Sequence, residues 1–390
     1  MSNVTNFGDQ LTELKGQGLL RRRRLAGTAC GPEMLIDGKP VLSFASNDYL
    51  GLASHPHLID AATQGMLRWG VGAGASEYLG GHFPPNRDLE TQLATFVGAD
   101  KALHFATGYM ANIGIVPALA GRGDILFADK LNHASLIDAV RLSLAENHRY
   151  PHLDLSVLEG QLAASRAKHR LIVTDAVFSM DGDMAPLPEL LALADRFDAW
   201  LLVDDAHGFG VLGPQGRGTA AHFGLKPTGR LIVMGTLGKA AGVSGAFVAG
   251  DADVIDWLEQ SARTAIFTTG VPPALTFALL ESLKLIEAGD GLRTHLQTLI
   301  ARLRAGLQPI CVRAGWHLPP STTAIQPLII GGNDETLAVA DALLERGIWA
   351  PAIRPPTVPA GEARLRISLS ASHGEMQIDE LITALAAIAL

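Results

Sequence analysis

The feature that most constrains the fold is a series of short apolar runs between residues 102 and 250. Segments of helical pattern, such as residues 188–197, separate these runs, and turn-forming residues bound them. Apolar strands that alternate with helices indicate βα units and a mostly parallel sheet that is covered on both faces. We therefore expect an α/β protein. The predicted strands are residues 102–106, 125–128, 171–175, 200–204, 231–234 and 246–249.

Around residues 269–273 the pattern changes to a long helical region, and further strands follow at residues 324–330, 349–353 and 364–369. Before this sheet, an amphipathic helix with an apolar stripe at Leu11, Leu14, Leu19 and Leu20 precedes a short hairpin. Such a stripe needs a surface to pack on. The domains that we predict are an N-terminal arm at 1–45, a large domain at 46–285 and a smaller C-terminal α/β domain at 286–390, with which the arm packs.

Composition narrows the class of protein. A net charge of −8 at pH 7 argues against a protein that binds extended nucleic acid. Two cysteines are too few for a disulfide framework or a metal cluster, and they suggest a reducing compartment. No apolar stretch is long enough to span a bilayer, and the start lacks a signal-peptide core. We expect a soluble, cytoplasmic protein with no metal, no membrane contact and no nucleic-acid partner.

Polar residues follow several of the predicted strands. Because ligands of parallel sheets bind at the carboxyl ends of the strands, we expect these residues to share one edge of the sheet. They are Thr107 and Gly108, residues 129–133, residues 175–179, residues 204–207 and residues 236–239.

Lys239 lies in the glycine-rich stretch GTLGKAAGVSGAF, residues 235–247, between two apolar strands. A lysine on a rigid turn and partly out of water has a lowered pKa, as needed to form a Schiff base or to act as a base. Taken alone, a Gly-Lys pair more often contains an ordinary surface-loop lysine. The residues at the other strand ends favour a lysine that takes part in the chemistry.

Asp204 closes a strand in LLVDDAHGFGVLG, residues 201–213. An unpaired carboxylate would be costly there, so Asp204 needs a cationic or hydrogen-bonding partner, and a protonated ring nitrogen is one such partner. Nearby His207 can hydrogen-bond a phenolic oxygen. A metal site at Asp204, Asp205 and His207 is the alternative, but no second His or Cys cluster has metal-ligand spacing.

A phosphate site is predicted in ATGYMANIGIV, residues 106–116, where Thr107 is a plausible N-cap. The free N–H groups of Gly108 and Tyr109 at a helix N-terminus suit an anion. A phosphate clamp and a Schiff-base lysine together fit one cofactor that carries an aldehyde. His133 can stack on a flat ring, although a lone histidine is more often structural, and Ser179 offers a hydroxyl.

The motifs SNDYLGL, NHASL, VFSMDGDMAPL, VDDAHGFGVLGPQGRG, TLGK with GVSGA, TTGVPPA and AIRPPTVPAGEARLRISLSASH together resemble the α-oxoamine synthase family of pyridoxal-phosphate enzymes. The likeness runs from about residue 20 to the C-terminus. It implies the type I fold of PLP-dependent transferases, similar to aspartate aminotransferase, with a seven-stranded sheet in the large domain. It also implies pyridoxal 5′-phosphate (PLP) as cofactor and a homodimer with its active site at the subunit interface.

The resemblance implies an acyltransferase that condenses an amino acid with an acyl thioester and releases carbon dioxide. IRPPTVPAGEARLR and the arginines after Leu20 look like the member in biotin biosynthesis that joins L-alanine to a pimeloyl thioester of coenzyme A or of an acyl carrier protein. One alternative is a relative that uses glycine and a shorter acyl-CoA. Another is a non-catalytic subunit with the PLP fold.

The resemblance also assigns cofactor roles. Lys239 would form the Schiff base with the cofactor, Asp204 would pair with the pyridinium nitrogen, and His133 would stack on the ring. His207 and Ser179 would contact the ring oxygen. The phosphate would be held by Gly108, Tyr109 and Thr236, with Thr268 or Thr269 from the neighbouring subunit.

On the substrate side, the resemblance makes Arg366 the leading candidate for binding the amino-acid carboxylate, with Arg354 second. The other implied substrate contacts are Asn47, His133, Thr357 and, for the far carboxylate of the acyl chain, Arg21. Some positions depart from the family pattern but leave the cofactor residues unchanged. Glu77, Gly80 and Asn86 bear on the acyl-chain preference, and Ala240 and Ala241 follow the lysine.

Overall fold

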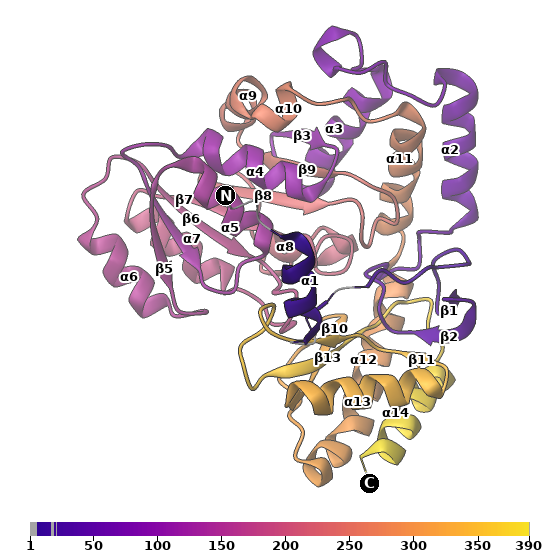
Figure 1. The fold of residues 1–390 in the computed structure, drawn as a ribbon. Coiled ribbons are helices and arrows are strands. Elements are labelled where there is room, and N and C mark those ends of the chain that lie inside the picture. The colour runs from indigo at the N-terminus through magenta and orange to yellow at the C-terminus, as the bar shows by residue number, and fades with distance from the viewer. Residues whose placement is uncertain (1–5, 17–18, 21, 390) are drawn as a thin grey trace.

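A seven-stranded sheet forms the centre of the fold (Figure 1). The computed structural model describes residues 6–16, 19–20 and 22–389, so the predicted role of Arg21 lies outside the described residues. Strand β9 is antiparallel to both of its neighbours, and the other adjacent pairs are parallel. The order is β3 (Lys101–Phe105), β9 (Ala246–Gly250), β8 (Leu231–Thr236), β7 (Trp200–Asp204), β6 (Arg170–Asp175), β4 (Ile125–Asp129) and β5 (Glu146–Tyr150).

The predicted apolar runs all form strands of this sheet. Strand β5 was not among them, because its sequence ENHRY has only its final residue, Tyr150, fully buried. An edge strand needs little apolar side-chain surface, since one of its long sides faces solvent. The seventh strand was expected from the family resemblance alone.

Helices cover both faces of the sheet (Figure 1). On one face, α4 (Gly108–Leu119), α5 (Ala134–Ser143) and α9 (Ala252–Ser261) bury residues such as Ile115 and Leu136 against the strands. On the other face, α6 (Leu155–Ala164), α7 (Leu187–Arg196) and α8 (Thr219–His222) bury residues such as Leu158 and Leu190. Burial on both faces explains why the inner strands are continuous apolar runs.

Four more helices belong to this part of the chain. They are α2 (Pro56–Trp69), α3 (Pro84–Val97), α10 (Arg263–Ile266) and α11 (Pro273–Glu287). Helix α2 runs beside α11 (Figure 1), and a Cβ at Gly65 would lie only 2.8 Å from Ala274 Cα. The glycine-rich residues 70–82 are irregular apart from one 3₁₀ turn, η1 (Glu77–Leu79).

A second, smaller α/β unit follows α12 (Asp290–Ala314). Its antiparallel sheet contains β10 (Ile325–Gly331), β13 (Ala363–Ser368) and β12 (Ala352–Ile353), and its other helices are α13 (Asn333–Glu345) and α14 (Glu375–Ile388). The strand predicted at 349–353 is two strands, β11 (Ile348–Trp349) and β12. The intervening residues, Ala350 and Pro351, let the chain change sheets.

The N-terminal arm contains the predicted hairpin, formed by β1 (Glu33–Ile36) and β2 (Lys39–Ser43). Asp37 and Gly38 make its turn with φ of 50° and 79°, as a two-residue hairpin turn requires. Strand β2 also pairs with β11, so the arm joins the C-terminal unit through a shared sheet. The domain boundaries near residues 45 and 285 remain a prediction.

Helix α1 (Phe7–Gly16) lies apart from these sheets, and all its residues are exposed. The side chains of Leu11 and Leu14 are 55% and 39% exposed, and Leu20 is 48% exposed. The predicted apolar stripe therefore lacks the packing that we expected within the described chain. Among the helices of residues 6–16, 19–20 and 22–389, none is long and apolar enough to cross a membrane.

Replacing Leu202 with alanine tests the core of the large sheet. Leu202 lies in β7 and is 0% exposed, so the cavity left by the change should lower the free energy of unfolding by about 2–5 kcal/mol. The control is Leu142→Ala on α5. Leu142 is 58% exposed, so this change should lower the free energy of unfolding by less than about 0.5 kcal/mol. Urea unfolding at one protein concentration measures both, and equal losses would contradict this account of the core.

Candidate active site

One cavity of about 190 Å³ brings together most of the predicted cofactor residues. It lies where β4, β6, β7 and β8 end and where α4 begins. The predicted residues that line it are Gly108, Tyr109, His133, Ser179, Asp204, His207, Thr236 and Lys239. Asn112, Ser135, Asp175, Ala206 and Met234 line it as well.

Asp204 is buried at the end of β7, with 4% of its surface exposed. One carboxylate oxygen accepts the N–H of Ala206 at 3.0 Å, and the other accepts Nδ2 of Asn112 at 2.7 Å. Asp175 is its neighbour on β6, in register. Burial and the charge of Asp204 raise the pKa of Asp175 well above its usual value. We infer that Asp175 carries a proton.

Lys239 follows β8 on a turn closed by a 2.8 Å hydrogen bond from Gly242 N–H to its carbonyl oxygen. Its Nζ lies 2.9 Å from Nε2 of His207. Burial lowers the pKa of Lys239 to about 8, while the charge of Asp204 opposes that shift. An amine with this pKa is suited to Schiff-base formation and to proton transfer. Ala240 and Ala241 point into the hydrophobic core.

His207 connects Lys239 to a second group of polar residues. Its Nδ1 lies 2.7 Å from Oη of Tyr49, which is fully buried. Tyr49 donates its proton to Oδ1 of Asn47 at 3.0 Å. Burial and the charge of Lys239 lower the pKa of His207 well below its usual value, so the ring is neutral.

Arg366 on β13 completes this group and connects it to the smaller unit. Its Nη1 donates to Oδ1 of Asn47 at 3.0 Å and to Oγ of Ser368 at 2.8 Å. Its Nε donates to the carbonyl oxygen of Ser179 at 2.6 Å. The guanidinium is buried and held in a fixed orientation beside residues of the cavity. A planar guanidinium held in this way suits recognition of a carboxylate.

His133 is fixed through both its backbone and its ring. Its N–H donates to Oδ2 of Asp175 at 2.7 Å, and its Nδ1 lies 2.7 Å from Oγ of Ser135. Burial lowers the pKa of His133, and the nearby Lys239 adds to this effect while Asp204 opposes it. The ring is therefore neutral.

The start of α4 forms a cradle for an anion. Thr107 is the N-cap that the sequence predicted, since its Oγ1 accepts the N–H of Met110 at 3.2 Å. The first N–H groups of a helix have no acceptor within it, and here they belong to Gly108 and Tyr109. A Cβ at Gly108 would lie 3.6 Å from Oγ1 of Thr236, so glycine keeps the space between them open. This cradle, with the Lys239 amine and the Asp204 carboxylate, fits PLP.

Some predicted residues lie elsewhere. The phenol of Tyr109 donates to Asp138, so its backbone N–H is the group available to a phosphate. Thr268 and Thr269 are outside the residues that line the cavity, and Thr269 forms a β-bridge with Ser76. Arg354 and Thr357 share a turn in which Thr357 N–H donates to the Arg354 carbonyl at 3.0 Å, and they too lie outside the cavity lining.

Sequence reasoning missed three polar residues of this site: Tyr49, Asn112 and Ser135. Asp175 was expected at this edge of the sheet because it ends a predicted strand, but its position beside Asp204 follows from the strand order. Tyr49 and Ser135 lie within the motifs SNDYLGL and NHASL, but nothing local indicates their partners. Asn112 follows Gly108 by one helical turn, which places it on the same side of α4 as the phosphate cradle.

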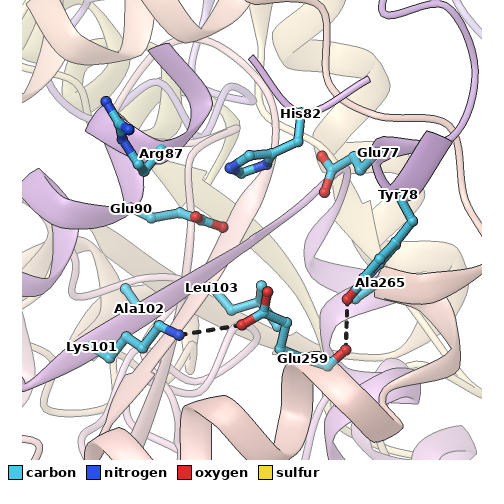
Figure 2. Close-up of a pocket in the computed structure, with 10 residues that line it drawn as sticks. All are labelled: Glu77, Tyr78, His82, Arg87, Glu90, Lys101, Ala102, Leu103, Glu259 and Ala265. Carbon is cyan, nitrogen blue, oxygen red and sulfur yellow. Dashed lines mark hydrogen bonds and ion pairs between the residues drawn. The ribbon is translucent and has the colours of Figure 1, made fainter. Parts of the chain in front are cut away.

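A second cavity, of about 360 Å³, is larger but has different chemistry (Figure 2). Glu77, Glu90 and Glu259 surround it, and Lys101 pairs with Glu259 at 3.2 Å. Oε1 of Glu90 accepts the N–H of His104 at 2.9 Å. Burial, with the nearby charges of Glu77 and Glu259, raises the pKa of Glu90 to about 7. None of the predicted cofactor residues lines this cavity.

The departures from the family pattern lie near this second cavity. Glu77 lines it, and buried Asn86 donates from Nδ2 to the carbonyl oxygen of Val271 at 3.2 Å. Gly80 ends the 3₁₀ turn with φ of 104°, a conformation that favours glycine. The other two departures, Ala240 and Ala241, are buried in the hydrophobic core. None of the five residues lines the 190 Å³ cavity.

Comparisons with known proteins agree with this geometry. The sequence model of the aminotransferase class I and II family matches residues 39–385. The 8-amino-7-oxononanoate synthase of Herminiimonas arsenicoxydans is 62% identical over 382 residues, which is 97% of this chain and 97% of that protein.

Two solved structures are similar over most of the chain. A serine palmitoyltransferase variant from S. paucimobilis with a bound PLP–myriocin aldimine has a TM-score of 0.91 at 30% identity, covering 98% of this chain and 96% of that one. The 8-amino-7-oxononanoate synthase of Francisella tularensis has a TM-score of 0.76 at 31% identity, covering 89% and 97%.

Replacing Glu90 with glutamine tests the electrostatics of the larger cavity. A carboxyl whose folded pKa is raised from 4.5 to about 7 loses stability as the pH rises between these values. Glutamine keeps an oxygen for His104 N–H but cannot ionise. The Tm of the variant relative to the original chain should therefore increase from about pH 5 to about pH 8. Asp88→Asn, exposed on the same helix, is the control, and a flat difference for Glu90→Gln would refute the raised pKa.

Proposed function

This chain belongs to the aminotransferase class I and II family and, within it, to the α-oxoamine synthases, and on that premise we propose that it catalyses the reaction for which its relatives are named, 8-amino-7-oxononanoate synthesis. It is a PLP-dependent acyltransferase with the type I transferase fold. It joins L-alanine to a pimeloyl thioester, with release of carbon dioxide and the free thiol, in biotin biosynthesis. The observation that best supports this proposal is that Lys239, Asp204 and the start of α4 line the same cavity.

Each of these groups suits one part of PLP. Lys239 would bind its aldehyde carbon, Asp204 its ring nitrogen, and the N-terminus of α4 with Thr236 its phosphate. His133 would stack on the ring, with His207 and Ser179 beside its oxygen. When bound, PLP supplies an electron-poor ring that stabilises negative charge at the Cα of an amino acid.

Lys239 and Arg366 would divide the work on L-alanine. The lowered pKa of Lys239 suits an amine that takes the Cα proton and later returns one. Arg366 would bind the carboxylate and thereby set which Cα bond faces the ring, because Asn47, Ser179 and Ser368 fix its guanidinium. Its contacts with Asn47 and Ser179 favour Arg366 over Arg354 for this role.

The acyl donor is proposed to lie toward the N-terminal arm. Arg21 would meet the far carboxylate of the pimeloyl chain, and Thr357 would contact substrate. Coenzyme A and an acyl carrier protein both remain candidate carriers of the thioester.

We further propose a homodimer in which Thr268 or Thr269 of one subunit helps to hold the phosphate in the other. Thr269 is exposed and Thr268 is half-buried, and they follow Phe267, which is 70% exposed, outside the cavity of their own subunit. An exposed aromatic side chain next to polar groups suits a subunit interface. Free Cys30 and Cys311 fit an enzyme of the cytoplasm.

A substrate panel tests the proposed function. L-alanine and glycine are combined with pimeloyl, succinyl and acetyl thioesters, and carbon dioxide and thiol release are measured. Alanine with the pimeloyl donor should give the highest kcat/KM. Lys239→Ala should lower it by at least about 1,000-fold, since it removes both the covalent attachment and the base. Lys226→Ala, at an exposed site, is the matched control.

The other outcomes of the panel distinguish the alternatives. Preference for glycine and a short donor would assign the chain to the glycine-using relatives. Failure to release thiol from any donor would favour a non-catalytic subunit. Turnover retained by Lys239→Ala would exclude its proposed role.

Substitution of the two candidate arginines tests how the amino-acid carboxylate is bound. Arg366→Ala should raise the KM for L-alanine by about 10- to 100-fold, because charge-assisted hydrogen bonds to the carboxylate are lost. The KM for the pimeloyl donor should change much less. Arg354→Ala is the comparison, and a larger alanine effect there than at Arg366 would reverse the assignment.

A further inference from the structure

A chain of buried polar groups connects Asp204 to His133 on one side of the cavity. Asn112 on α4 donates from Nδ2 to Asp204 at 2.7 Å and to Oγ of Ser135 at 2.9 Å. Ser135 Oγ lies 2.7 Å from Nδ1 of His133. Asn112 is 0% exposed and Ser135 is 1% exposed, so water does not compete for these contacts.

The direction of each hydrogen bond follows from Asp204. A carboxylate can only accept, so the amide group of Asn112 must present its NH₂ to it. The second N–H of that NH₂ is donated to Ser135, whose hydroxyl proton is then directed at His133 Nδ1. The opposite amide orientation would place an oxygen against the carboxylate. Within the described residues Oδ1 of Asn112 has no partner, which shows that the contact with Asp204 dominates.

The backbone independently requires the same state of His133. The N–H of Ser135 also donates to Nδ1 of His133, at 3.3 Å. Two donors directed at Nδ1 leave it without a proton. A neutral imidazole then carries its proton on Nε2, which makes Nε2–H a hydrogen-bond donor.

We infer that Ser135, through Asn112 and Asp204, is a positioning residue that holds His133 in the Nε2–H form. This inference rests on the proposed function, in which negative charge develops on the thioester carbonyl oxygen when the alanine Cα attacks it. A donor that is already oriented beside the reacting atoms can stabilise such an oxygen. The carboxylate of Asp204 would thus pair with the cofactor ring and, through three hydrogen bonds, fix the tautomer of His133.

The test uses the PLP-loaded enzyme and Ser135→Ala. Imidazole ¹⁵N NMR, with His133 assigned from His133→Ala, reads the tautomer directly. The original enzyme should show Nε2–H, and the variant should show a mixture with Nδ1–H, because only the longer backbone contact remains. The kcat should fall about tenfold, the KM for L-alanine less than about twofold, and the PLP absorbance should be unchanged.

Two further variants separate positioning from general stability. Ser143→Ala removes another buried hydroxyl of α5, one that donates to the Val140 carbonyl, and should change neither kcat nor the NMR spectrum. In the His133→Ala background, Ser135→Ala should cause no further loss of kcat. Asn112→Leu, of similar size, interrupts the chain one step earlier and should reproduce the NMR change.

An unchanged His133 tautomer in both Ser135→Ala and Asn112→Leu would overturn the inference. So would an equal loss of kcat from Ser135→Ala when His133 is absent. If the original enzyme makes no product from alanine and the pimeloyl donor while the NMR change still occurs, the proposed function fails and the positioning role of Ser135 stands.

Discussion

The buried charge of Asp204 is the constraint on which the site depends. A carboxylate taken out of water requires hydrogen bonds and a cationic partner, and it raises the proton affinity of groups around it. Two hydrogen bonds come from Ala206 and Asn112. Its neighbour Asp175 therefore keeps a proton. Asp175 in turn accepts a hydrogen bond from the backbone N–H of His133 and so fixes its position. A protonated ring nitrogen would satisfy the need of Asp204 for a further cationic partner.

The parallel sheet is what allows one carboxylate to influence so many groups. Strands β4, β6, β7 and β8 all run in one direction, so their carboxyl ends meet at one edge. Asp175 and Asp204 are therefore adjacent although 28 intervening residues separate them in the sequence. The antiparallel β9 leads the chain away from this edge after Lys239, so the lysine is held between a strand that arrives and a strand that leaves.

The inner sheet and the polar residues at its edge could be predicted from the sequence because both depend on local patterns. Buried strands are apolar runs, and the residues that bind ligands follow them directly. Sequence reasoning missed β5, whose polar sequence reflects an edge position. It also missed Tyr49 and Asn112, since their partners lie 158 and 92 residues away in the chain. Only the folded topology shows that a tyrosine in one motif hydrogen-bonds a histidine in another.

Charge identifies the site better than cavity size does. The 190 Å³ cavity and its rim hold two cations, Lys239 and Arg366, beside the carboxyl group of Asp204, while burial keeps both histidines neutral. The N-terminus of α4 adds partial positive charge. This excess suits a ligand pair that carries a phosphate and a carboxylate. The larger cavity has three glutamates in its lining together with Lys101, Arg87 and His82 (Figure 2), so it lacks this excess of positive charge.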